Sequence, residues 1–184
     1  MSTNITQVLV DEHQLILRMI AVLEKNVREM QAGRFRNWQF YLDAVDFIRN
    51  YADRFHHAKE EDVLFVALVN NGMPEKNSPI EAMLMEHDQG RAHVRSMEEA
   101  ALKALDGEIG QVPIIAEHAL GYIELLRGHI QKEDDILYPL AERVLPEDVR
   151  PGMLTAYRAA GKKTPGLEQK YQHIVAHYEN LHAA

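Results

Sequence analysis

The chain has 184 residues, 46% of them hydrophobic and 26% charged, which is enough for one domain with a hydrophobic core. It contains no cysteine, and this excludes disulfides, iron–sulfur clusters, thiolate nucleophiles and cysteine-type zinc sites. Its formal net charge of −8 argues against a nucleic-acid or anionic-membrane surface. Neither a signal peptide nor an apolar run near the roughly 20 residues that cross a bilayer is apparent, so we expect a cytoplasmic protein.

Apolar residues recur at helical spacing through most of the chain, and no strand-like alternation is found. Turn-forming residues separate the periodic stretches, and Pro139 should kink or end the last of them. Short connections between long helices favour antiparallel neighbours. The sequence therefore predicts an all-α fold, an antiparallel up-down four-helix bundle with helices over about 4–32, 37–68, 79–105 and 111–140.

The C-terminal part differs from the rest in its proline and glycine content. Residues 145–166 contain several helix breakers and predict a loop with a short helical piece near 153–159. A shorter closing helix is expected from 167 to about 181. We thus expect a bundle over residues 1–145 and a C-terminal loop and helix over 146–184 packed on it.

Two similar motifs stand on the second and fourth predicted helices. Each has a histidine followed four residues later by a glutamate, then an acidic residue and an apolar run. On a helix, residues four apart share a face, so each motif directs an imidazole and a carboxylate to one point. Mixed nitrogen and oxygen donors suit a transition metal. The two pairs are His57 with Glu61 and His129 with Glu133.

Two further histidines repeat in the same way on the first and third helices. Glu12-His13 and Glu86-His87 lie 74 residues apart, each within an apolar stripe. The chain therefore resembles two copies of one helical hairpin, related by an approximate two-fold axis with their ligands meeting in the core. Four histidines and two bridging glutamates would give each of two octahedral metals four protein bonds. A bridging oxide or hydroxide would leave one open position on each metal.

These motifs resemble the hemerythrin-like, or HHE cation-binding, family over about residues 6–143. The resemblance implies a four-helix bundle that holds two oxo- or hydroxo-bridged non-haem irons. Oxygen-carrying hemerythrins have a fifth histidine one turn after the third-helix one, where this chain has Arg91. The four-His, two-Glu set is more similar to bacterial di-iron proteins linked to nitric-oxide stress and iron–sulfur repair. The ligands implied are His13, His57, Glu61, His87, His129 and Glu133.

Other polar residues receive lesser roles. His56 is expected on the flank, because on an α-helix it points about 100° away from His57. His118 and Tyr122 precede His129 by three and two turns and could line the approach to the metals, and Arg91 could face them. His173 and His177 lack matching carboxylates and are expected on the surface.

Two classes of function follow. The first is a di-iron protein that binds, senses or destroys O₂, peroxide or nitric oxide in stress or iron homeostasis. Whether it has peroxidase-like, catalase-like or nitric-oxide-reactive turnover is left open by the sequence. The second is an iron storage or donation module without turnover, and reversible O₂ carriage is the further alternative. A reductase or an iron-acceptor protein would be the partner. Two open positions predict autoxidation in air rather than O₂ carriage.

Overall fold

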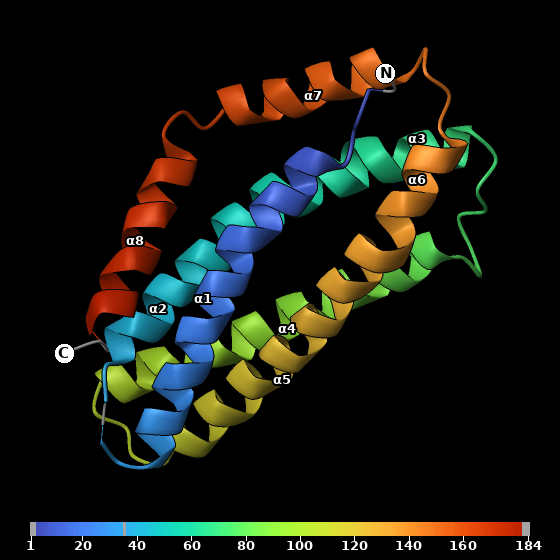
Figure 1. Ribbon diagram of the computed structural model, residues 1–184. Coiled ribbons are helices and arrows are strands. Elements are labelled where there is room, and N and C mark those ends of the chain that lie inside the picture. The colour runs from blue at the N-terminus through green and yellow to red at the C-terminus, as the bar shows by residue number, and fades with distance from the viewer. Residues whose placement is uncertain (1–2, 35, 182–184) are drawn as a thin grey trace.

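The computed structural model describes residues 3–34 and 36–181, and those residues form helices joined by loops, with no strand among them. Figure 1 shows long helices lying side by side, with the last two helices along one side of the molecule. The predicted all-α class is therefore confirmed. Among the described residues, no helix is long and apolar enough to cross a membrane.

The first arm of the fold is α1, Gln7–Gln31. Its start is fixed by Asn4, whose Oδ1 accepts hydrogen bonds from the backbone N–H groups of Thr6 and Gln7, at 3.0 and 2.8 Å. The N–H of Gln7 would otherwise lack a partner within the helix, because the first turn of a helix has no helical carbonyls before it.

The second arm is one long helical path in which α-helix and π-helix alternate. The π-helix was not expected from the sequence, because apolar periodicity reports an average turn and not a local extra residue. From Ile48 to His57 the backbone forms a π-helix, whose turn is wider than that of an α-helix. The path consists of α2 (Trp38–Phe47), η1 (Ile48–His57), η2 (Glu60–Leu64) and α3 (Phe65–Asn70).

The third arm is α4, Pro79–Leu105, which begins with a capping serine and a proline in its first turn. The Ser78 Oγ accepts a hydrogen bond from the backbone N–H of Glu81 at 3.4 Å. The fourth arm again contains a π-helix. It consists of α5 (Gln111–Lys132), η3 (Glu133–Leu137) and α6 (Tyr138–Val144).

Pro139 was expected to kink or end the fourth arm, and the helical path does not end there but continues to Val144. Pro139 lies directly after the π-turn of η3, where α-helical hydrogen bonding is already interrupted. A proline there removes less hydrogen bonding than it would in an uninterrupted α-helix.

The C-terminal part is more helical than predicted. The helix α7 spans Arg150–Lys162, well beyond the expected piece at 153–159, because Pro151 lies in its first turn, where a missing N–H costs nothing. The helix α8, Leu167–Leu181, packs against α1 and η1. Its Tyr171 and Val175 are fully buried.

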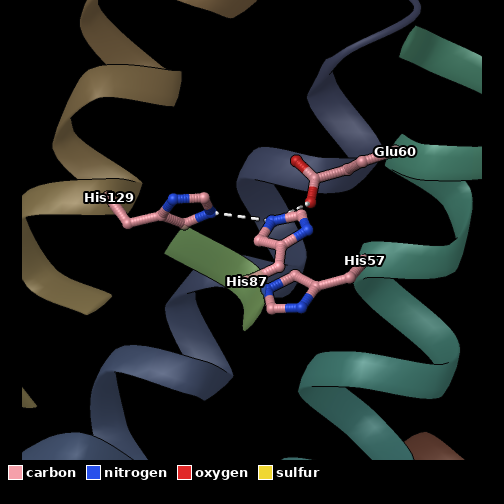
Figure 2. A group of neighbouring side chains, drawn as sticks. All are labelled: His57, Glu60, His87 and His129. Atoms are coloured by element: carbon pink, nitrogen blue, oxygen red, sulfur yellow. Dashed lines mark hydrogen bonds and ion pairs between the residues drawn. The ribbon is translucent and has the colours of Figure 1, made fainter. Parts of the chain in front are cut away.

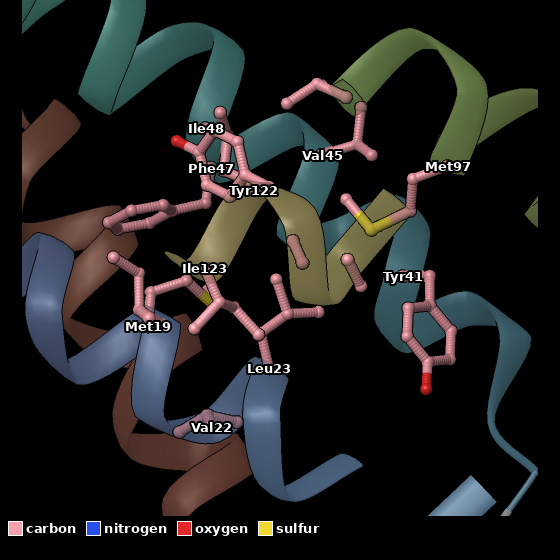
Figure 3. Close-up of a cluster of buried hydrophobic side chains, with 14 of the residues drawn as sticks. Met19, Val22, Leu23, Tyr41, Val45, Phe47, Ile48, Met97, Tyr122 and Ile123 are labelled. Carbon is pink, nitrogen blue, oxygen red and sulfur yellow. The ribbon is translucent and has the colours of Figure 1, made fainter. Parts of the chain in front are cut away.

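Helix α5 packs against both α1 and α4, and α4 also packs against α2. Two apolar clusters fill the space between the arms. One includes Met19, Met97 and Tyr122 (Figure 3), and the other includes Leu9 and Leu137. Along each of the four arms, the residues between these two clusters carry buried histidines or glutamates. The fold therefore places a layer of polar side chains between two apolar layers.

Candidate metal centre

Seven buried side chains from all four arms converge in this polar layer. They form two overlapping groups, and within each group one nitrogen or oxygen atom per residue lies within 4.8 Å of the others. Figure 2 shows the first group, with His129 on α5, His87 on α4, and His57 and Glu60 on the second arm. We call it the three-histidine group, and the second group the two-histidine group. The first comprises His57, Glu60, His87 and His129, and the second comprises His13, His56, Glu60 and Glu133.

The inward-facing atoms lie at distances typical of ligands around a common ion. The Nε2 atoms of His13 and His56 are 3.0 Å apart, and so are those of His87 and His129. Neighbouring ligands of an octahedral ion, at bonds of about 2.1 Å, are about 3.0 Å apart. Both histidine pairs therefore have the spacing that one metal each would require.

Two carboxylates connect the groups. Glu133 has one oxygen 3.1 Å from His129 Nε2 and the other 3.3 Å from His13 Nε2. Glu60 Oε2 lies 3.7 Å from the Nε2 atoms of both His56 and His87. Each carboxylate thus reaches both groups, as a ligand that bridges two metals would.

The outer nitrogen of each histidine lies beside a carboxylate. Such carboxylate partners fix the tautomer and orientation of metal-binding histidines and leave Nε2 free to bind. Four contacts are 2.7–2.9 Å long, and the fifth, from His57, is 3.5 Å. The pairs are His13–Asp134, His56–Glu12, His57–Asp53, His87–Glu61 and His129–Glu86.

Electrostatics in this layer favour a cation. Burial, and then the neighbouring Glu133, raises the pKa of Glu60 well above its usual value. Burial also lowers the pKa of His57 to about 4, so its imidazole is neutral, as a metal ligand must be. Among the described residues, neither Glu60 Oε2 nor either Glu133 oxygen has a well-formed hydrogen bond. Buried carboxylate oxygens without partners are costly unless a cation neutralises them, so the donors fit metal ions.

The structure brings together five of the six predicted ligands but replaces Glu61 by Glu60. Glu60 is fully buried, whereas Glu61 lies outside the layer, 2.7 Å from His87 Nδ1 and 2.8 Å from an Arg91 nitrogen. The expectation that His56 lies on the flank is also wrong, since it is 1% exposed and belongs to the two-histidine group. Successive side chains diverge less in a π-helix than in an α-helix, so His56 and His57 can both face inward.

A second alignment of the second arm with the fourth arm matches more residues and pairs Glu60, rather than Glu61, with Glu133. His56-x-x-Lys59-Glu60 matches His129-x-x-Lys132-Glu133 at a separation of 73 residues, including the lysine. These lysines have equivalent places: Lys59 pairs with Glu12 and Lys132 with Glu86. In this register His57 corresponds to Ile130 and Phe65 to Tyr138, so the two repeats carry different side chains at these positions.

The residues assigned lesser roles lie at different distances from the layer. Arg91 contacts Glu61, Asp53 and Asp88, so it touches the outer carboxylates rather than the converging atoms. Tyr122 is buried, and its hydroxyl has no hydrogen-bond partner among the described residues. His118 pairs instead with His93, with 3.3 Å between their Nδ1 atoms. His173 and His177 are exposed, as expected.

Comparison with known proteins also indicates a cation-binding domain. The family model for the hemerythrin HHE cation binding domain matches residues 4–141. Uncharacterized protein Rv1995 of Mycobacterium tuberculosis and Uncharacterized protein Mb2018 of Mycobacterium bovis are each 22% identical to this chain over 138 residues. That alignment covers 74% of this chain and 53% of each relative, so the chain spans about half the length of these relatives. No solved structure gives a significant match.

The four arms, the converging histidines and carboxylates, and the family match over most of the sequence lead to one conclusion: the chain belongs to the hemerythrin HHE cation-binding domain family.

Proposed function

We propose that the four arms form an antiparallel bundle that holds two bridged non-haem irons and binds one small ligand, such as O₂ or nitric oxide. The observation that carries this proposal is the pair of overlapping ligand groups connected by two carboxylates. Glu60 and Glu133 would bridge the ions. His57, His87 and His129 would hold one ion, and His13 and His56 the other.

The donor count differs from the one expected from the sequence. Three histidines and one oxygen from each glutamate would give one ion five protein bonds, and two histidines with one oxygen from each glutamate would give the other ion four. A bridging hydroxide would fill the first ion and leave one open position on the second. Such an ion supplies a redox-active Lewis acid that takes up one small molecule.

The burial and orientation of the metal-binding side chains favour ligand binding over iron storage. The donors are buried, and each histidine has a carboxylate beside its outer nitrogen. A stored or donated ion needs ligands that release it, whereas these side chains are oriented to retain it. Because one ion alone would have an open position, we favour binding of one ligand. The alternative, a reaction at two open positions, was expected from the sequence-based donor count.

Metal analysis combined with an azide titration tests the proposal. Protein purified from iron-supplemented cells should contain two irons per chain. Azide, a small anion that replaces O₂ at open iron positions, should saturate at one equivalent per iron pair in the absorption spectrum. One iron or fewer per chain would refute the dinuclear site, and saturation at two azides would refute the single open position.

A further inference from the structure

A cavity of about 220 Å³ adjoins one half of the metal centre. Its walls include the imidazoles of His57, His87 and His129, but neither His13 nor His56. The cavity therefore meets the three-histidine half, whereas the proposed open position lies in the two-histidine half. An occupant of this cavity would contact side chains rather than take a coordination position.

Most of the cavity wall is apolar, and the buried hydroxyl of Tyr122 lacks a hydrogen-bond partner among the described residues. Tyr122 lines the cavity with a side chain that is 2% exposed, and its hydroxyl makes no hydrogen bond to a described residue. Figure 3 shows this ring beside Ile48, which lines the same cavity. A buried hydroxyl without a partner is unfavourable, so an oxygen atom of an occupant would improve its environment. The apolar wall consists of Ile48, Val94, Leu125 and Leu126.

Gly90 keeps the cavity open on the α4 side. A Cβ atom at this position would lie 3.4 Å from Tyr122 Cε2 and 3.8 Å from Leu125 Cδ2. A larger side chain would therefore extend into the space in front of the tyrosine ring. Glycine in a helix interior is less stable than alanine, so its presence here is consistent with a use for the space.

Among the described residues, the charged side chains around the cavity are paired, with Arg95 as the exception. Arg91 is satisfied by three carboxylates, and Arg49 makes two contacts with Glu98. Glu86, the acidic wall residue on α4, is paired with Lys132. Arg95 is exposed, lines the cavity and makes no ion pair or hydrogen bond with any described residue. Arg95 is therefore the charged wall side chain that is left to pair with an occupant.

We propose that this cavity binds a small organic carboxylate with an apolar body. Its carboxylate would pair with Arg95, its body would lie against the four apolar wall residues, and one oxygen would accept the hydrogen bond of Tyr122. Cavities for drug-sized ligands have volumes of about 300–1,000 Å³, so this one suits a smaller molecule, the size of a single ring or a short branched chain. Such a ligand lies against the three imidazoles without binding metal.

Titration calorimetry on the purified, iron-containing protein tests the proposal with benzoate and isovalerate as probes. Each should bind at one equivalent per chain. Benzamide lacks the charge and acetate lacks the apolar body, so each should bind at least about tenfold more weakly than benzoate. Saturating azide should leave benzoate binding unchanged, because azide occupies the iron position in the other half.

Three substitutions locate the site. Arg95→Gln and Tyr122→Phe should each weaken benzoate binding about tenfold, with iron content unchanged. Arg143→Gln, which removes an exposed arginine from α6, is the matched control and should bind as the wild type does. Absence of binding at millimolar benzoate and isovalerate, equal affinity in the Arg95 variant, or competition by azide would overturn the proposal. Iron content below two per chain would count against the proposed function alone, since the cavity walls are side chains.

Discussion

Glu60 and Glu61 are neighbours with opposite environments. The Glu60 carboxylate is completely buried among histidines, while Glu61 is half-buried and satisfied by Arg91 and by the outer nitrogen of His87. Sequence reasoning identified the right helix and a carboxylate one turn after a histidine. It could not choose between the two glutamates, because both lie four residues after a histidine. The matching Lys59 and Lys132 would have decided it.

A paired substitution tests which glutamate holds metal. Glu60→Ala should lose most of both irons, because a bridging carboxylate serves both ions. Glu61→Ala should retain both, with some loss of stability, because His87 loses its outer partner. Iron analysis of the two variants beside the wild type gives the answer. Loss of iron from the Glu61 variant to the same extent would show that Glu61 takes part as a ligand.

His57 corresponds to Ile130 in the internal repeat, so the first hairpin supplies three histidines to the polar layer and the second supplies two. Replacing His57 with isoleucine would leave each of the two proposed ions with two histidines and one open position. The His57→Ile protein should bind two azides per iron pair, where the wild type binds one. An azide titration followed by absorption measures this number. A stoichiometry that stays at one would mean that His57 is not a ligand.

At the scale of elements, the helices were predictable and the π-turns were not. Apolar periodicity located the four arms within a few residues. The π-helical segments η1, η2 and η3 hold or adjoin most of the converging residues of the second and fourth arms. An extra residue per turn leaves no clear signature in the spacing of apolar residues, since the pattern resumes a few residues later.

Aromatic side chains of the closing helix α8 pack against the second arm. Tyr171 is fully buried and packs edge-on against Phe47 at a centroid distance of 5.3 Å, while its hydroxyl bonds Asp46. Tyr171→Ala should lower the free energy of unfolding by about 3–5 kcal/mol, the usual cost of removing a buried aromatic ring. Tyr171→Phe, which removes only a half-exposed hydrogen bond, should cost about 1 kcal/mol. Urea denaturation measures both; equal costs would mean that the ring contributes little.

At the scale of the molecule, the metal centre connects two similar hairpins. Each hairpin contributes a glutamate to the shared centre, so neither has a complete site alone. The likeness of the two hairpins was predictable from the repeated Glu-His pairs. The unequal number of histidines in the two hairpins was not predictable, because it depends on which of the adjacent His56 and His57 is matched to His129.

Removing the metals should destabilise the whole bundle, and more so at high pH. Burial alone would lower the pKa of His13, but Asp134 and Glu133 outweigh it and raise the pKa to about 9, from 6.5. Stability from a raised histidine pKa is complete below the unfolded value and is lost as pH rises to the folded one. The melting temperature of the metal-free protein should therefore fall between pH 6.5 and 9. Iron-loaded protein, in which the metal would hold His13, should change less, and parallel pH profiles for the two forms would contradict this.

The most direct test of the central claim is anomalous diffraction at the iron absorption edge from crystals of the iron-loaded protein. Two neighbouring iron peaks should appear in the polar layer. Glu60 and Glu133 should contact both peaks, His57, His87 and His129 one of them, and His13 and His56 the other. A single peak, or two peaks bridged by Glu61 instead of Glu60, would contradict the account.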